Sequence, residues 1–568
     1  MTLRIANCSG FYGDRLSAAR EMVEGGPIDV LTGDWLAELT MFILAGNRLK
    51  GRPGYAPTFL TQLEHVLGTC LDRGIRIVSN AGGLDPAGCA EAVRELAARL
   101  GLSADVAHVT GDDLTGRDLD LVNADTGERL AATPLTANAY LGGRPIARAL
   151  SAGADVVVTG RVTDAALVTG PGIWRYGWGP DDLDPLAGSV VAGHVIECGC
   201  QATGGNYAFF QDVPDLAHCG FPLAELRADG SAVITKHPGT GGLVSVGTVT
   251  AQLVYEIGGP RYLGPDVVAR FDTITLTDDG PDRVLISGVR GEPPPDTLKV
   301  AVNYLGGYRN TMTLVLTGLD VEAKARAAEE AIWARIPKES FDAVDVTLTG
   351  SGLLRITVMD ADRRTAGRAF SAAVVETGLA SYPGFHALSP PGDASPYGVY
   401  WPVLVPAAEV RPRVWLNGEE LPYAVSGTSA GPVPVRPVER RAAVPSGPCV
   451  RLPLGRVAGA RSGDKGGDAN LGVWVDTDER YAWLEAYLTA GRLAALLPEL
   501  AAHRIERHEL PGVRALNFVV HGLLGRGVAA SPRMDPQAKA LGEKLRAQVV
   551  DIPAALVDSR VDRESGLS

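Results

Sequence analysis

The chain has 568 residues, of which 46% are hydrophobic and 21% charged, and its formal net charge is −13. This length exceeds that of one compact domain, so we expect two or three domains, and the apolar share excludes a mainly disordered chain. An acidic protein lacks the basic footprint that nucleic acids require, although a local basic pocket can still hold an anionic cofactor.

Targeting signals and cysteine content indicate the cellular compartment in which a protein is found. No apolar stretch is long enough to cross a membrane, and the start MTLRIANCSG lacks the charged and long apolar regions of a signal peptide. The seven cysteines are an odd number, sparse and irregularly spaced, which excludes a disulfide framework. We therefore expect a soluble protein of the cytoplasm that binds neither membranes nor nucleic acid.

The first 170 residues alternate short apolar runs with amphipathic ones. Strands are predicted at 4–8, 28–32, 75–80, 104–111 and 154–160, and helices at 17–25, 35–49, 57–73, 87–100 and 145–153. This alternation is typical of a mostly parallel α/β sheet with both faces covered, in which ligands bind beyond the carboxyl ends of the strands.

The segments that follow these strands each carry glycine with a carboxylate, an amide or a hydroxyl. They are 8–15, 32–38, 79–86, 110–114 and 159–167. Helix capping by aspartate explains any single turn of this kind. Five of them at equivalent positions of a sheet favour a polar cleft.

A glycine-rich turn opens residues 236–259 and runs into an apolar-periodic helix. Backbone N–H groups at such a junction can hold a phosphate or a carboxylate, but the turn is neither a P-loop nor GxGxxG, and an ordinary tight turn fits equally well. His237 lies in this glycine and proline loop rather than on an apolar face, which favours function over core packing. The residues whose N–H groups are candidates are Gly239, Thr240, Gly241 and Gly242.

The rest of the chain changes character twice. Residues 261–423 combine alternating strand patterns with a surface helix, which indicates an α+β portion packed against the first sheet. Proline, glycine and serine predict a linker at 424–448. Residues 451–568 read as a compact unit of strands and helices. The predicted fold class is therefore α/β, with a mostly parallel sheet at about 1–260, the α+β portion completing a main domain of 1–440, and a small C-terminal α/β sandwich domain.

The stretch HVIECGCQATGGNY at 194–207 reads as the end of an apolar strand. His194, Cys198 and Cys200 would give at most three soft ligands, and no second Cys/His pair follows at a zinc spacing, so no metal site is predicted. Partial burial would raise the pKa of Glu197 and make it a general acid or base, although a salt bridge or loop anchor fits as well. Cys198 is a candidate nucleophile if a base lies near it, but buried cysteines are usually inert.

Two further pairs carry charge. Asp164 follows Arg161 by three residues, so the pair can bind a carboxylate and activate water, or merely cap the next helix. Asp464 and Lys465 lie in the glycine-rich turn ARSGDKGGDANLG before an apolar strand. This turn can reach into a neighbouring cleft, or it is an exposed hairpin.

Several phrases resemble signature segments of the acyclic terpene utilisation (AtuA-like) family. They are GFYGDR, GDWLAELTM, NAGGLDP, GRVTDAAL, GHVIECGCQATGGN, KHPGTGGLVSVGTVTAQLVYEIGGP and ARSGDKGGDANLGVWV. The resemblance covers about 3–440 and, with the family's small C-terminal domain, 451–555. Cys200 stands where alanine is expected in the family's phrase, which weakens any metal or redox interpretation of the cysteines.

The resemblance implies a part in degrading citronellol- and geraniol-like acyl-CoA esters. It implies a lyase or hydratase that acts on a branched 3-hydroxyacyl-CoA, with coenzyme A as part of the substrate and no tightly bound cofactor. The alternatives are a non-catalytic scaffold or subunit of an acyl-CoA carboxylase or hydratase system and a Mg²⁺-dependent hydrolase. A homo-oligomer is expected, because an extra small domain often packs across symmetric interfaces.

The chemistry so implied needs a general base and donors for a thioester enolate. The candidate catalytic residues are Glu197, Asp164, His237 and Cys198. The candidate substrate-binding residues are Arg161, Asn206, Gly239, Thr240, Gly241, Gly242, Asp464 and Lys465. In this scheme Glu197 is the acid/base, Asp164 and Arg161 are its partner or a carboxylate clamp, and Asp464 and Lys465 close the site from the C-terminal domain.

Overall fold

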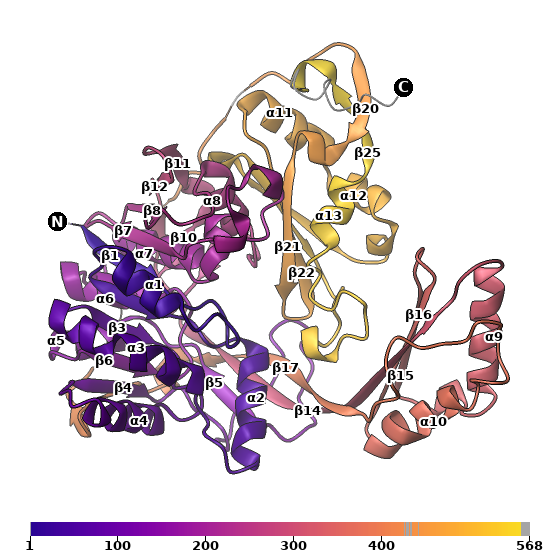
Figure 1. Ribbon diagram of the computed structural model, residues 1–568. Coiled ribbons are helices and arrows are strands. Elements are labelled where there is room, and N and C mark those ends of the chain that lie inside the picture. The colour runs from indigo at the N-terminus through magenta and orange to yellow at the C-terminus, as the bar shows by residue number, and fades with distance from the viewer. Residues whose placement is uncertain (1, 425–426, 428–430, 432–433, 441, 558–568) are drawn as a thin grey trace.

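The computed structural model describes residues 2–424, 427, 431, 434–440 and 442–557 (Figure 1). Part of the linker predicted at 424–448 therefore lies outside the described residues. No helix in these ranges is both long and apolar enough to cross a membrane.

A mixed sheet of 11 strands forms the body of the molecule. Its five central strands are parallel and almost wholly buried, as expected for a sheet that helices cover on both faces. The predicted α/β class is confirmed. In sheet order the parallel strands are β1 (Leu3–Asn7), β2 (Val30–Gly33), β3 (Arg76–Ser79), β6 (Val156–Thr159) and β4 (Val106–Thr110). Antiparallel strands extend both edges: β7 (Pro222–Leu226), β8 (Ala232–Lys236), β12 (Arg283–Ser287) and β11 (Thr275–Asp278) beyond β1, and β18 (Arg413–Leu416) and β19 (Glu419–Leu421) beyond β4.

A crevice is expected between β3 and β6, because the helices that follow these two strands leave the sheet on opposite faces. The helix after β3 packs on one face and the helix after β6 on the other, so the carboxyl ends of these neighbouring strands lie at a topological switch point. One face carries α1 (Ala18–Gly25), α3 (Pro57–Arg73) and α4 (Pro86–Arg99), and the other carries α5 (Arg144–Ser151), α6 (Ala166–Tyr176) and α7 (Leu183–Ile196). The remaining helix of this part, α2 (Glu38–Leu49), follows β2 and borders the crevice.

The prediction of a strand end at 194–207 is wrong, because the residues up to Ile196 form the end of helix α7. Every residue of this helix from Leu186 to Ile196 is buried, so its sequence lacks the amphipathic period of a surface helix. A short apolar run without that period cannot be told from a buried strand by sequence alone. Glu197 follows the helix, and a 3-10 turn over Gly199–Thr203 continues the chain.

A long strand connects the body to a second lobe. β14 (Thr297–Val315) pairs through its first half with β5 (Thr136–Ala139) and through its second half with β16 (Leu353–Asp360). β17 (Ser395–Pro406) runs along its other edge. We call residues 307–396 the arm, which projects from the body in Figure 1. The arm also contains β15 (Ala343–Leu348), α9 (Val321–Trp333) and α10 (Phe370–Val375).

The C-terminal domain has a four-stranded antiparallel sheet and its own apolar core. Its strands β21 and β22 form a hairpin that lies between the body and the arm (Figure 1). Apolar runs in the sequence predict strands at the positions of β21, β22 and β24, but not those of β23, β20 or β25. In sheet order the strands are β21 (Gly459–Lys465), β22 (Asp468–Trp474), β24 (Ala515–Val520) and β23 (Ile505–Leu510), the ribbon is β20 (Cys449–Pro453) with β25 (Val549–Pro553), and the helices are α11 (Asp478–Tyr487), α12 (Ala490–Leu496) and α13 (Leu541–Arg546).

The remaining elements join the body to this domain. They are α8 (Val246–Leu253) and a small sheet of β9 (Arg261–Leu263), β10 (Val268–Arg270) and β13 (Arg290–Glu292).

Buried asparagines dock the C-terminal hairpin onto the segment after α8. Asn470 Oδ1 accepts the N–H of Glu256 at 2.7 Å, and Asn517 Nδ2 donates to the carbonyl of Gly258 at 2.6 Å. The backbones approach so closely that a Cβ at Gly472 would lie 2.3 Å from Val254 Cγ2. Side chain to backbone bonds therefore fix the hairpin against the crevice.

Asn470→Ala is expected to uncouple the two domains. The substitution leaves the Glu256 amide without its acceptor, which costs about 1–3 kcal/mol. Calorimetry should then resolve a separate, lower melting transition for the C-terminal domain. Asn310→Ala is the control, since this buried asparagine donates to two carbonyls of the arm, those of Gly367 and Gly392. A single unchanged transition for Asn470→Ala would contradict the docking role.

Candidate active site

Polar side chains from four parallel strands meet at the crevice, as the sequence predicts. Asp34, Asn80, Asp112 and Arg161 follow β2, β3, β4 and β6. Asn80 Nδ2 donates to Asp34 Oδ1 at 2.5 Å, and the Arg161 N–H donates to Asp112 Oδ2 at 2.9 Å. The carboxyl ends of the strands therefore form a polar floor that contains two hydrogen-bonded pairs.

The Arg161 guanidinium lies at the centre of this floor with only 2% of the residue exposed. Its Nη1 donates to the Leu36 carbonyl at 2.5 Å, its Nη2 lies 3.5 Å from Asp164 Oδ1, and its Cζ lies 4.4 Å from the centre of the Tyr140 ring. The Tyr140 hydroxyl in turn donates to Glu38 Oε1 at 2.7 Å. A buried cation is tolerated only with such partners.

Glu197 faces His194 rather than a free cation. His194 Nε2 lies 3.1 Å from the Gln252 carbonyl, which only accepts, so Nε2 carries a proton and Nδ1 is the acceptor. Glu197 Oε1 lies 3.3 Å from Nδ1. Burial, together with the Asp164 charge, raises the pKa of Glu197, and burial lowers the pKa of His194 to about 4. Both directions favour a neutral pair in which Glu197 keeps its proton.

The C-terminal hairpin adds charge from the other side, as predicted for Asp464 and Lys465. Lys465 Nζ donates to the Glu256 carbonyl at 2.8 Å and lies 5.7 Å from the centre of the Tyr262 ring. Lys539 comes from the loop before α13 and lies 3.8 Å from Asp464 Oδ1 and 3.4 Å from Glu256 Oε1. We call the polar floor, the partners of Arg161, the Glu197–His194 pair and these charges the cluster. It is complete only when the C-terminal domain is docked.

A pocket of about 550 Å³, part of it open to solvent, lies beside the cluster. Its lining combines carboxyl, amide and hydroxyl groups with aliphatic and aromatic side chains. A Cβ at Gly398 would lie 2.6 Å from the Phe42 ring, so glycine is needed for this wall to close. The lining residues are Ala37, Glu38, Leu39, Phe42, Asn303, Gly398, Tyr400, Asp464, Gly466, Gly527, Val528, Ala529 and Gln537.

Two carboxyls of this pocket differ strongly in acidity. Burial alone would raise the pKa of Glu38, but the charges of Arg161 and Lys299 and the Tyr140 hydroxyl outweigh it and bring this pKa to about 2. Burial raises the pKa of Asp464 to about 7, and the negative charge of Glu38 adds to the effect. One pocket thus holds an ionised carboxylate and a carboxyl that titrates near neutrality.

The other carboxyls of the cluster also hold protons more tightly than usual. Burial raises the pKa of Glu256 to about 8, with a contribution from the Asp464 charge. Burial likewise raises the pKa of Asp34 and of Asp164, although Arg161 opposes both shifts. Burial lowers the pKa of Lys539 to about 8.

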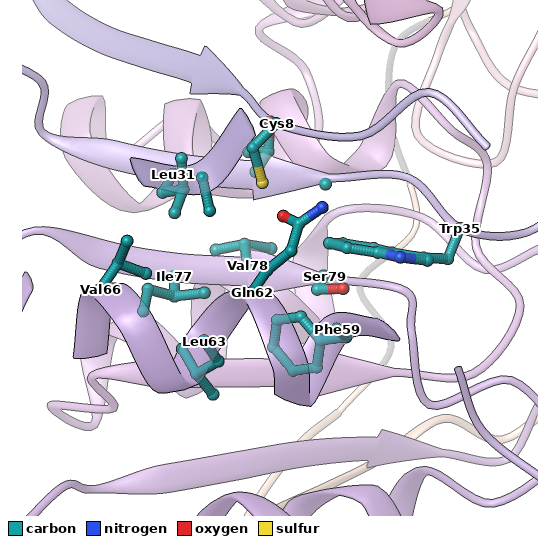
Figure 2. A pocket seen from close by; sticks show the side chains of 13 residues that line it. Cys8, Leu31, Trp35, Phe59, Gln62, Leu63, Val66, Ile77, Val78 and Ser79 are labelled. Atoms are coloured by element: carbon teal, nitrogen blue, oxygen red, sulfur yellow. The ribbon is translucent and has the colours of Figure 1, made fainter. Parts of the chain in front are cut away.

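A second cavity, of about 240 Å³, lies inside the core (Figure 2), where Trp35 and Ser79 of its lining adjoin Asp34 and Asn80. Its walls come from β1 to β3 and α3, and the Gln62 side chain points between Cys8 and Trp35. None of its lining residues is charged. It is therefore a gap in core packing rather than a candidate site.

Several predicted residues lie outside the cluster. His237 Nε2 contacts the Met22 carbonyl at 2.9 Å, and its ring packs against Gly25 and Gly26 of the neighbouring helix end. Asn206 has a φ of 57°, and its carbonyl accepts from Arg461 Nη1 at 2.8 Å. These residues hold the surrounding loops in place.

Backbone groups of the glycine-rich turn already make hydrogen bonds within the protein. The Thr240 N–H donates to the His237 carbonyl, the Gly242 N–H donates to the Pro214 carbonyl, and the Gly241 carbonyl accepts the Gly220 N–H. A Cβ at Gly241 would lie 2.3 Å from the Asp215 carbonyl oxygen, so this turn packs against the segment beside it. Gly239 stands at the tip with a φ of 79°.

Cys198 is half-buried beside Glu197, and burial raises the pKa of its thiol. Its backbone lies against Gly10, where a Cβ would lie 2.8 Å from the Cys198 carbonyl carbon. Among the described residues, no three His, Cys, Asp or Glu side chains are grouped to hold a metal ion.

Six residues of the cluster were not singled out from the sequence, although one of them, Glu38, lies in the polar segment predicted at 32–38. Lys299 illustrates the signal that was present, a lysine inside an apolar strand, and its Nζ lies 5.3 Å from the ring centres of both Tyr140 and Tyr400. The missed residues are Glu38, Tyr140, Glu256, Lys299, Tyr400 and Lys539.

Two family models match the chain. The model of the acyclic terpene utilisation family protein AtuA matches residues 3–416, and that of the AtuA ferredoxin-like domain matches residues 452–551. These matches confirm the resemblance seen in the sequence. No curated protein and no solved structure matches.

Asp464→Asn is expected to stabilise the folded protein above neutral pH. The unfolded chain releases the Asp464 proton near pH 4 but the folded protein keeps it up to about pH 7, so this carboxyl lowers stability as pH rises across that window. Asparagine removes the effect, and the melting midpoint at pH 7.5 should rise by about 1–3 °C relative to wild type, with no gain at pH 4.

Asp229→Asn serves as the control of opposite sign. The Ser231 hydroxyl lowers the pKa of this exposed carboxyl, so its stabilising effect is present at neutral pH and is lost on acidification. A midpoint of Asp464→Asn that falls at pH 7.5 would contradict the raised pKa.

Proposed function

Since this chain belongs to the acyclic terpene utilisation family AtuA, it takes part in the use of acyclic terpenes, and we propose that it is an enzyme acting on a branched acyl-CoA. The reaction is a lyase or hydratase step on a 3-hydroxyacyl thioester. Coenzyme A enters as part of the substrate, and no other cofactor is invoked. The observation that carries this proposal is a pocket lined by two carboxyls in unlike surroundings. Glu38 accepts the Tyr140 hydroxyl near the Arg161 and Lys299 charges, which lower its pKa, whereas burial raises the pKa of Asp464.

Asp464 is the proton-transfer residue of this proposal. A general acid or base works best when its pKa lies near the working pH, and enzymes that use two carboxyls set their acidities apart. Asp464 lines the pocket and its side chain is 20% exposed, so it can reach a bound substrate. Glu38 stays ionised, keeps Tyr140 and Arg161 in place, and holds up the pKa of Asp464.

The cations around the pocket match the charge that the reaction develops. Removing a proton from C2, or breaking the bond between C2 and C3, places an electron pair on the thioester as an enolate. Lys465 and Lys539 stand beside Asp464, and the Tyr400 ring lines the same pocket. Each such donor aimed at a developing oxyanion contributes about 10²–10³ in rate.

The same carboxyl groups can complete the proton transfers of both C–C cleavage and dehydration. In C–C cleavage, ionised Asp464 takes the 3-hydroxyl proton, the C2–C3 bond breaks to leave a ketone and an enolate, and a protonated carboxyl returns a proton to C2. In dehydration, a base takes the C2 proton and protonated Asp464 gives its proton to the leaving hydroxyl. Asp164, 30% exposed and beside Glu197 in the cluster, is the partner that exchanges the second proton.

The test compares Asp464→Asn with wild type on branched C10-type acyl-CoAs. Turnover should fall by about 10²–10⁴, because one general acid or base is lost, while the thermal shift on ligand binding is kept. The limb of the pH profile near 7 should disappear. Asp551→Asn, at an exposed position of the same domain, should change neither.

Mass spectrometry of the products then separates a cleaved ketone from a dehydrated acyl-CoA. Glu197→Gln should reduce turnover less than Asp464→Asn does, because the Glu197 side chain is only 8% exposed and faces His194, whereas Asp464 lines the pocket. The acyl-CoA proposal would be abandoned if no thioester shifted the melting midpoint of the wild type.

A further inference from the structure

The apolar part of the pocket is a slot between a helix and a loop. Leu39 and Phe42 lie three positions apart on one face of α2, and Val528 and Ala529 line the same pocket from the loop between β24 and α13. Leu39 is 44% exposed although it is a large apolar side chain. We call the space among these four residues the slot.

The loop that forms the slot's far wall is fixed at both ends by its own domain. Asp468 accepts the Gly522 N–H at 2.8 Å and lies 2.8 Å from His521 Nδ1. At the other end the Ser462 hydroxyl donates to the Ala538 carbonyl at 2.6 Å. We call residues 523–537 the wall loop.

The middle of the wall loop is held by the arm as well as by the Arg533–Glu499 ion pair of its own domain. Arg309 Nη1 donates to the carbonyls of Ala529 at 3.4 Å and Ser531 at 3.3 Å, and Arg355 Nη1 donates to the Pro532 carbonyl at 2.8 Å. In the register of β14 and β16, Thr313 opposes Arg355, so both arginines project from the same face of the arm's sheet. The other face carries the arm's own core, which includes Met312 and Ile356.

We propose that the slot receives the hydrocarbon chain of the substrate, and that the arm sets the width of the slot through Arg309 and Arg355. The substrate part of this inference rests on the proposed function. Asp464 and Tyr400 line the same pocket as the slot, so a chain in the slot leaves its thioester end near Asp464. Arg309 and Arg355 are positioning residues, because they act through the wall loop. This assigns the arm a part in substrate selection.

The first experiment fills the slot. Calorimetry with saturated acyl-CoAs from C4 to C10 should give wild-type affinities that rise about fourfold per methylene until the slot is full. Ala529→Trp should remove that rise, while binding of coenzyme A itself is kept. Leu388→Trp, at an exposed position of the arm outside the pocket, is the matched control.

The second experiment releases the wall loop. In the Arg309→Met/Arg355→Met double variant, amide hydrogen exchange of residues 523–537 should quicken about tenfold, since three hydrogen bonds to the loop are lost. The preferred chain length should broaden, with KM changed more than kcat for short chains. Arg309→Lys keeps a donor and should restore part of the protection.

Arg335→Met is the control for the arm, since this arginine of the arm bonds to the Ala331 carbonyl and pairs with Glu376. It should leave the wall loop's exchange unchanged. The melting midpoint of each variant checks that the arm still folds, because Arg355 also lies 3.4 Å from Asp345.

The outcomes separate this inference from the proposed function. Free alkanoic acids of the same lengths are titrated alongside the thioesters. Chain binding that Ala529→Trp abolishes supports the slot even if no thioester is turned over. Turnover whose chain-length dependence ignores Ala529→Trp would overturn the slot, and unchanged exchange in the double arginine variant would overturn the role of the arm.

Discussion

The burial of one guanidinium, that of Arg161, governs the chemistry of this protein. A cation taken out of water must be matched by nearby negative charge, and ionised Glu38 supplies it at the switch point of the sheet. The remaining carboxyls of the cluster then meet like charge without a full partner, so burial drives them to keep their protons. The contrast between ionised Glu38 and protonatable Asp464 follows from this single constraint.

The site exists only because three parts of the chain converge. The parallel sheet brings Arg161 and Asp164, the long strand β14 brings Lys299, and the C-terminal hairpin brings Asp464 and Lys465. The asparagine bonds of β22 and β24 to the segment after α8 hold the hairpin in place. Domain docking and site formation are therefore one event, which gives the small domain a chemical role as well as a structural one.

Local sequence patterns predict much of the body, but they do not predict how the three parts of the chain come together at the site. The parallel strands, the polar turns after them and the reach of the Asp464 turn all follow from periodicity and turn chemistry, which are short-range properties. The helix before Glu197 escaped because it is buried on every side. Lys299, Glu256 and Lys539 escaped because their importance comes from contacts across hundreds of residues, which spacing along the chain cannot reveal.

Infrared difference spectroscopy across neutral pH tests the central claim most directly, since it detects protonated carboxyls without any substrate. Spectra of the wild type recorded between pH 6 and pH 8 should lose a carboxylic acid C=O band that shifts when aspartate is labelled with ¹³C, and Asp464→Asn should lack this band. A wild type in which no aspartate carboxyl titrates above pH 6 would contradict the account, because the pocket would then hold two ionised carboxylates and no proton to transfer.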